Sequence, residues 1–110
     1  MSPKSTDATG VKHDDSKPAL QYIPKAAMFA MGDAFAHGAK KYGAFNYRGG
    51  LAVTRTLAAA VRHIYQFLDG ENLDPESLKS HLGHAMASIA MTIDTLEHRP
   101  DLDDRPKASK

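Results

Sequence analysis

Three successive segments of the chain repeat apolar side chains every third or fourth position, which is the spacing of an amphipathic α-helix. The first helix should occupy residues 24–43 and the second residues 51–68. The third should occupy residues 75–98, with Asp74 as its N-cap and Pro75 in its first turn. The pattern therefore predicts an all-α fold, a small three-helix domain.

Each predicted helix gathers its apolar side chains into one stripe. We expect the stripes to pack together as the core, because a helix buries its apolar face. They comprise Met28, Met31, Phe35 and Ala39 in the first helix, Val53, Leu57, Val61, Ile64 and Leu68 in the second, and Leu78, Leu82, Ala85, Ile89, Ile93 and Leu96 in the third.

The third helix is unusual in its lack of charge. No side chain between Lys79 and Asp94 carries a formal charge, whereas a surface helix normally has charged residues on its outer face. Gly83, Ala87 and Ala90 share a second face, where they would let another backbone come close. A helix enclosed on several sides needs more neighbours than one such chain supplies. We therefore expect homo-oligomerisation to complete the domain.

The two ends of the chain differ from the middle. Residues 1–22 should form an N-terminal arm, residues 23–98 a helical domain, and residues 99–110 a charged flexible tail. A core of roughly 75 residues is near the size at which burial is marginal and oligomerisation often helps.

Composition excludes several classes of protein. The net charge is only +1, with 14 basic and 13 acidic residues, so we expect neither a nucleic-acid partner nor a membrane surface. Cysteine is absent, which excludes disulfides and thiolate sites. No apolar run approaches the ~20 residues of a membrane span, and the N-terminus lacks a signal-peptide core. We expect a cytoplasmic protein.

Histidines and carboxylates cluster around the turn between the second and third predicted helices. His81 and His84 face the same side of a helix, where they would bind a divalent metal or a phosphate, or else pack and bond to a loop. The carboxylates of Glu71, Asp74 and Glu76 would hold Mg²⁺, or else cap the helix and complement its dipole.

Two further groups of residues are candidates. Asp33 and His37 lie one helical turn apart and would form a catalytic or ligand pair, or a partly buried hydrogen bond. Residues 40–48, KKYGAFNYR, mix cations with aromatic rings, which suits a base and its phosphates. The alternative is a capped helix end followed by an aromatic loop that closes over the core.

Five short motifs in order resemble one known family. They are GxKxDxxKP at residues 10–18, GAxKYGxxN at 38–46, AxxRH at 59–63, GExxDxES at 70–77 and HLxHA at 81–85. Together they resemble the phage-borne N-terminal domain of dATP/dGTP diphosphohydrolases. The resemblance implies hydrolysis of a purine deoxynucleoside triphosphate to its monophosphate and pyrophosphate. It also implies kinship with MazG-like all-α pyrophosphohydrolases, which are oligomers that hold Mg²⁺ between helices. The ExxE and ExxD pattern of that superfamily is missing from the expected helices.

The resemblance and the residue chemistry point to the same candidate site. The expected catalytic residues are Glu71, His81 and His84, and the expected Mg²⁺ ligands are Glu71, Asp74 and Glu76. The expected nucleotide-binding residues are Lys12, Asp14, Lys17, Lys41, Tyr42, Asn46, Arg62 and His63. We expect Arg62 and His63 to face the same pocket as Glu71, His81 and His84.

Two other functions stay open at this point. A helical oligomer of this kind would also serve as a non-catalytic module that sequesters a nucleotide, such as a host signalling nucleotide, without a metal. A purely structural or regulatory oligomer is the third possibility.

Overall fold

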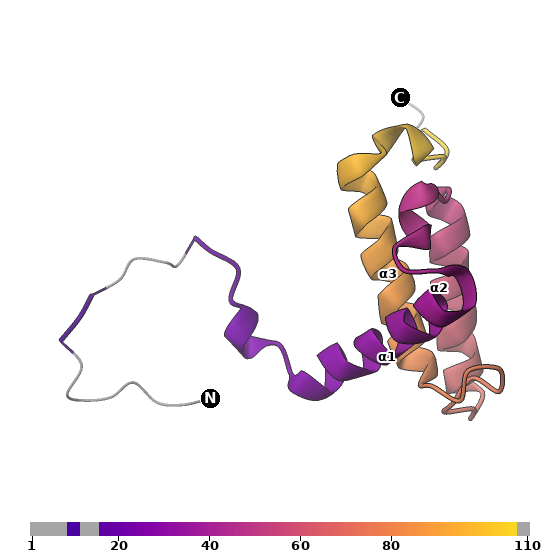
Figure 1. Cartoon of the computed structure of the whole chain (residues 1–110), viewed down its shortest axis with the longest axis horizontal. Coiled ribbons are helices and arrows are strands. Elements are labelled where there is room, and N and C mark those ends of the chain that lie inside the picture. The colour runs from indigo at the N-terminus through magenta and orange to yellow at the C-terminus, as the bar shows by residue number, and fades with distance from the viewer. Residues whose placement is uncertain (1–8, 12–15, 108–110) are drawn as a thin grey trace.

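The computed structural model describes residues 9–11 and 16–107. Within these ranges the chain forms helices and no strand, so the all-α prediction is confirmed. The elements are η1 (Leu20–Tyr22), α1 (Lys25–Tyr42), η2 (Asn46–Gly49), α2 (Val53–Leu68), α3 (His81–His98) and η3 (Pro100–Leu102). Helices α2 and α3 lie side by side and antiparallel, while α1 crosses them on one side (Figure 1). No helix of the described part is long and apolar enough to cross a membrane.

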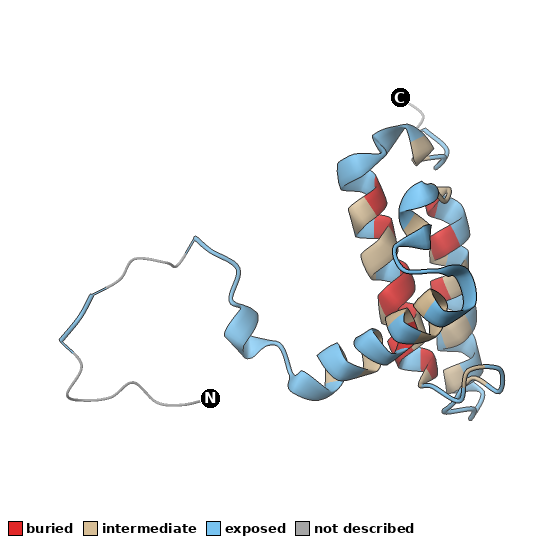
Figure 2. Cartoon of the chain, viewed as in Figure 1, coloured by how far each residue is buried: buried red, intermediate tan, exposed pale blue. Residues whose placement is uncertain are grey.

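The core lies where α1 and α2 meet α3, and small side chains dominate it. Ala60 of α2 and Ala85 and Ala87 of α3 are buried, as are several threonines (Figure 2). Thr56 and Thr92 join α2 to α3 through a buried hydrogen bond of 2.6 Å between their hydroxyl groups. Small residues let the helices approach closely, so the fold buries little large apolar surface.

The large aliphatic stripes do not form this core, and the prediction that they would is wrong for most of α2 and α3. These side chains are between 38% and 70% exposed: Val61, Ile64, Leu68, Leu78, Leu82, Ile89, Ile93 and Leu96. The physical reason is that α1 packs on the small-residue face of α3 instead. A Cβ added at Gly83 would lie 2.4 Å from the carbonyl oxygen of Ala30 in α1. The face expected to meet another chain is therefore covered, at Gly83 and Ala87, within this chain.

The third helix begins at His81, not at Pro75 as predicted. Ser80 is its N-cap, and the serine hydroxyl accepts hydrogen bonds from the backbone N–H groups of Leu82 and Gly83. The carboxylate of Asp74 does cap a turn, but that turn ends at Leu78, whose φ of 61° is left-handed. Residues 69–80 thus form a folded loop between α2 and α3.

Residues 99–107 of the expected tail run back along the start of α2. The carboxylate of Asp104 accepts hydrogen bonds of 2.9 Å from the backbone N–H of Thr54 and 2.6 Å from its hydroxyl. This side chain satisfies a free N–H in the first turn of α2, which has no N-cap side chain of its own.

Candidate functional site

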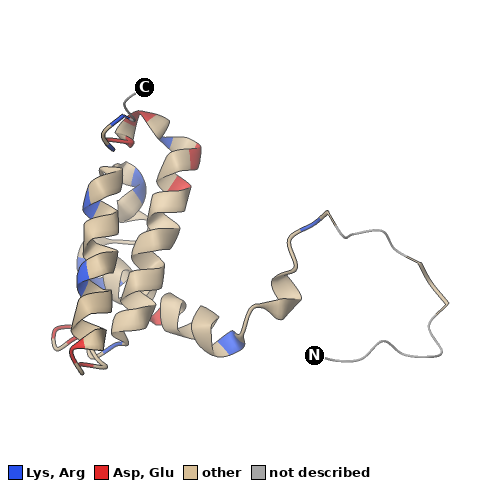
Figure 3. Cartoon of the chain, turned by 180° about the vertical axis from the view of Figure 1, so that it is seen from behind, with Lys and Arg blue, Asp and Glu red and all other residues tan. Residues whose placement is uncertain are grey.

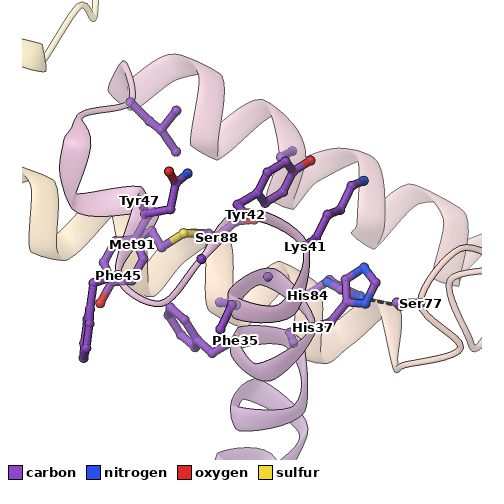
Figure 4. Close-up of a pocket in the computed structure, with 18 of the residues that line it drawn as sticks. Phe35, His37, Lys41, Tyr42, Phe45, Tyr47, Ser77, His84, Ser88 and Met91 are labelled. Carbon is purple, nitrogen blue, oxygen red and sulfur yellow. Dashed lines mark hydrogen bonds between the residues drawn. The ribbon is translucent and has the colours of Figure 1, made fainter.

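A cleft of about 790 Å³ opens between α1, α2 and α3 and the two loops that connect them (Figure 4). Helix α1 contributes one wall, and the loop after it closes one end. The loop 69–80 and the first turns of α3 form the other end. The residues that line it include Phe35, His37, Lys41, Tyr42, Phe45, Asn46, Tyr47, Arg55, His63, Asp74, Glu76, Ser77, His84, Ser88 and Met91.

Aromatic side chains line one end of the cleft. Phe35 and Tyr47 lie with their ring centroids 5.6 Å apart. Arg48 holds the loop between α1 and α2 in place. Its guanidinium makes two hydrogen bonds of 3.2 Å to Asp94 of α3 and lies against the rings of Phe45 and Tyr47. Phe45 adopts a left-handed backbone with a φ of 60°, which is uncommon for a residue with a side chain. The chain thus holds exposed aromatic surface in a fixed position beside the cleft.

Histidines line the opposite end. The rings of His63 and His84 stack, with centroids 4.8 Å apart, and His37 meets His84 edge-on at 5.9 Å. The Ser77 hydroxyl hydrogen-bonds to Nε2 of His84 at 2.6 Å. Burial lowers the pKa of His63, and the neighbouring His84 lowers it further. Burial also lowers the pKa of His84, although the charge of Asp74 opposes this shift. Both imidazoles are therefore neutral at neutral pH.

A chain of hydrogen bonds extends from this end into the protein. His81 is completely buried, and its Nε2 lies 2.6 Å from a carboxylate oxygen of Glu71. Its Nδ1 lies 2.8 Å from Nδ1 of His63. A carboxylate only accepts, so we assign the proton of His81 to Nε2, and its Nδ1 then accepts from His63. The Nδ1 atom of His81 in α3 therefore faces the Nδ1 atom of His63 in α2.

Asp74 lies beside these histidines. Its Oδ2 is 3.8 Å from Nδ1 of His63, and its Oδ1 accepts hydrogen bonds from the backbone N–H groups of Glu76 and Ser77. Burial alone would raise the pKa of this carboxyl group, but these two hydrogen bonds outweigh burial and lower it. Asp74 is therefore a carboxylate at neutral pH.

Two cations from different helices line the cleft. Lys41 of α1 makes an ion pair with Glu76, and this contact raises the pKa of the lysine and lowers that of the glutamate. Arg55 of α2 is exposed, and its guanidinium makes no hydrogen bond or ion pair with any residue that the structure describes. The guanidinium of Arg55 is therefore available to an anion in the cleft.

Comparison with known proteins identifies the family. The profile of the family described as "dATP/dGTP diphosphohydrolase, N-terminal" matches residues 7–105. The chain belongs to this family. It is also 32% identical over 97 residues to a "dATP/dGTP diphosphohydrolase" of Salmonella phage PMBT28. That match covers 88% of this chain but only 33% of the phage protein, so the chain spans about a third of its relative's length. No solved structure matches.

The structure brings about half of the predicted diphosphohydrolase site residues into the cleft. Those that line it are Lys41, Tyr42, Asn46, His63, Asp74, Glu76 and His84, whereas Glu71 and His81 lie behind His63. Arg62 is exposed and does not line the cleft, and neither does Lys17 of the arm. Lys12 and Asp14 lie outside the described residues.

The three carboxylates predicted to hold Mg²⁺ do not converge among the described residues. Glu71 bonds to His81 and Glu76 to Lys41, so only Asp74 belongs to a group of side chains close enough to share an ion. Mg²⁺ prefers oxygen ligands in octahedral geometry. The arrangement therefore does not fit the all-carboxylate Mg²⁺ site that we expected.

Sequence reasoning missed several residues of the cleft. Arg55 stands two helical turns before His63, so both face the same side of α2, and this spacing was a usable signal. His37 was named as a candidate, but as the partner of Asp33; it faces the cleft one turn before Lys41 and contacts His84 instead. Phe35 was assigned to the core and instead lines the aromatic end. Ser77 ends the motif GExxDxES, but its side chain was not among the expected site residues.

Proposed function

We propose that this domain binds a purine nucleoside triphosphate in the cleft and hydrolyses it to the monophosphate and pyrophosphate. The observation that carries the proposal is the division of the cleft into an aromatic end and an end with neutral histidines and a carboxylate. The family and the name of the phage relative support the same reaction. Whether the substrate carries ribose or deoxyribose is left to the assay.

The aromatic end suits the base. Tyr42, Phe45 and Tyr47 offer ring faces, and stacking contributes about 1–3 kcal/mol per base in proteins that bind single-stranded nucleic acids. The side-chain amide of Asn46 would pair with the edge of the base, because an amide both donates and accepts. The triphosphate would then extend towards the histidine end.

The other end suits the reaction. Lys41, and Arg55 two helical turns before His63, would bind phosphate oxygens by charge-assisted hydrogen bonds. A neutral imidazole accepts a proton, so His84 would take one from a water that attacks the α-phosphorus. As the new P–O bond forms, the bond from this phosphorus to the bridging oxygen breaks, and pyrophosphate leaves.

The binding step can be tested with two arginines of the same helix. Arg55→Ala should weaken binding of a non-hydrolysable dGTP analogue by about 10- to 150-fold, the usual loss for a charged hydrogen bond. Arg62→Ala is the matched control, because Arg62 is also exposed on α2 but does not line the cleft. Isothermal titration would measure both. A loss with Arg62→Ala alone would contradict the assignment of the site to the cleft.

The reaction itself needs a panel of nucleotides. The protein would be incubated with ribo- and deoxyribonucleoside triphosphates with and without Mg²⁺, while binding and pyrophosphate release are followed. Release from purine nucleotides supports hydrolysis, and the Mg²⁺ arm tests the predicted metal dependence. Binding without release would replace the proposal with the sequestering module, and no binding would refute both.

We also propose that the domain is a homo-oligomer, for a reason different from the small-residue face. At about 100° per residue, Val61, Ile64 and Leu68 of α2 lie opposite the residues that line the cleft. Leu82, Ile89, Ile93 and Leu96 of α3 lie on the same outer side. From behind, α3 shows charge only towards its C-terminal end (Figure 3). Apolar side chains exposed on the same side of two neighbouring helices would suit a second copy that packs about a two-fold axis.

Light scattering tests this surface. The native protein should be larger than a monomer at micromolar concentration, and Ile93→Glu should dissociate it, because a glutamate would be buried without a partner. Leu73→Glu is the control, since Leu73 is an exposed aliphatic residue in the loop 69–80. A native protein that is monomeric at this concentration would refute the proposal.

A further inference from the structure

Three potential metal ligands meet at the floor of the cleft, from three different segments. The group consists of His63 of α2, Asp74 of the loop and His81 of α3, and each offers one ligand atom within 4.8 Å of the other two. Two of them, His63 and Asp74, also line the cleft. The third is completely buried. This set differs from the all-carboxylate set expected from the sequence.

We infer that His63 Nδ1, His81 Nδ1 and Asp74 Oδ2 bind a divalent first-row transition metal ion. The two nitrogens are 2.8 Å apart, and the Nδ1 atom of His63 lies 3.8 Å from Oδ2 of Asp74. Ligands on a tetrahedral ion sit roughly 3.4 Å from one another, given metal–ligand distances of about 2.0–2.2 Å. To reach that spacing, the distance between the two nitrogens would have to grow by about 0.6 Å. The distance from His63 Nδ1 to Asp74 Oδ2 would have to shrink by about 0.4 Å.

Glu71 supplies the feature that distinguishes this group from a chance cluster. Histidine ligands of metals almost always donate their other ring N–H to a carboxylate or carbonyl, which fixes the tautomer and the ring orientation. The Nε2 of His81 makes this contact with Glu71 at 2.6 Å, and so leaves the lone pair of Nδ1 directed at the proposed ion. In the metal-free protein that lone pair accepts the Nδ1 proton of His63. When the ion binds, this proton moves to Nε2 of His63, so the imidazole stays neutral and its Nδ1 lone pair becomes free for the ion.

The ligand types select the class of ion. Two imidazoles and one carboxylate suit Mn²⁺, Fe²⁺, Co²⁺, Ni²⁺ or Zn²⁺, whereas Mg²⁺ takes oxygen ligands almost alone. Three protein ligands leave at least one coordination position for water or substrate, as in catalytic metal sites. Because His63 and Asp74 line the cleft, that position would face the proposed phosphate end. The role of the ion in hydrolysis rests on the proposed function, but its binding does not.

Cobalt gives the most direct test. Co²⁺ bound by nitrogen and oxygen ligands absorbs visible light, so the tag-free, chelator-treated protein is titrated with Co²⁺ alone and its spectrum is followed. We expect one equivalent per chain to give a saturable band. Asp74→Asn should weaken binding at least tenfold while Asn still accepts the two backbone hydrogen bonds. Glu71→Gln should weaken it by about 10- to 100-fold, the usual effect on a hydrogen-bond partner of a ligand.

Two neighbouring variants serve as matched controls. Glu76→Gln removes one carboxylate charge two residues from Asp74, and His37→Ala removes a cleft histidine that is not in the group. Both should keep the band. The inference fails if no band forms, if it survives Asp74→Asn and Glu71→Gln, or if the controls abolish it too. Circular dichroism shows that each variant is folded. The titration contains no nucleotide, so its failure would leave the proposed hydrolysis to be judged by its own assay.

Discussion

Gly83 is the residue on which the position of α1 depends, and Gly83→Ala tests this directly. A methyl group at Gly83 would lie 2.4 Å from the oxygen and 2.8 Å from the carbon of the Ala30 carbonyl group. Ordinary contact with a Cβ begins at 3.4 Å, so α1 would have to move by about 1 Å. Both neighbours are helix backbone, and no side-chain rotation can relieve the contact. Overpacking of this kind costs about 1–3 kcal/mol.

The same substitution elsewhere provides the control. Gly38 lies inside α1 with open space around its Cβ position, so Gly38→Ala should stabilise the domain by about 0.5–1 kcal/mol through helix propensity alone. Gly83→Ala gains the same propensity and loses more to the clash. We therefore expect the two variants to differ by about 1–3 kcal/mol. In a domain of this size that is a difference in Tm of at least about 4 °C.

The assay is urea unfolding followed by circular dichroism, combined with nucleotide titration. Helix α1 carries His37, Lys41 and Tyr42 into the cleft, so displacing it should weaken binding as well as stability. Gly38→Ala should bind normally, because Gly38 lines the cleft but a Cβ there would meet no heavy atom within 4 Å. If Gly83→Ala is as stable as Gly38→Ala and binds equally well, then α1 does not pack on α3 as described.

Two further predictions concern stability. Asp104→Ala should lower the midpoint of urea unfolding, because α2 loses the side chain that caps it. An unchanged midpoint would mean that the C-terminal segment does not hold α2. In chelator-treated protein the free energy of unfolding should fall as the pH drops below about 6.5. Burial lowers the pKa of His63 and of His84 in the folded protein, so these histidines take up protons more readily in the unfolded chain. The fall should end below those lowered pKa values, and His63→Gln should reduce it; a wild-type profile that is flat from about pH 7 to 5 would contradict this.

The bounds of the first two helices could be predicted because local chemistry decides them. Pro24 precedes α1, and Gly43 ends it with a φ of 98° that favours glycine. The packing of the helices could not be predicted in the same way. Both the small-residue face of α3 and its aliphatic stripe were suited to burial, and periodicity does not say which of them the same chain will cover. The contact between Gly83 and Ala30 decides this, and it joins residues far apart in the sequence.

The same uncertainty explains why Arg62 was preferred to Arg55. Arg55 and Arg62 stand seven residues apart, so at about 100° per residue they share the face of α2 that lies opposite its apolar stripe. They differ in their position along the helix axis, and only the position of α1 determines which of them lines the cleft. The histidine cluster was easier to find, because residues 63, 81 and 84 had to meet once α2 and α3 packed antiparallel through a short loop.

The late start of α3 is what assembles the proposed metal group. Had the helix begun at Pro75, seven residues of helix would separate Asp74 from His81, a distance of about 10 Å along its axis. Asp74 and Ser80 are both suitable N-caps, and local preference does not choose between them. The chain uses both, with one turn at Asp74 and the helix at Ser80, and the backbone N–H of His81 bonds to the carbonyl of Asn72. The loop thereby folds back so that Asp74 reaches His63. The one helix boundary that the sequence misplaced is therefore the one that brings a carboxylate to the histidines, as expected where function overrides local preference.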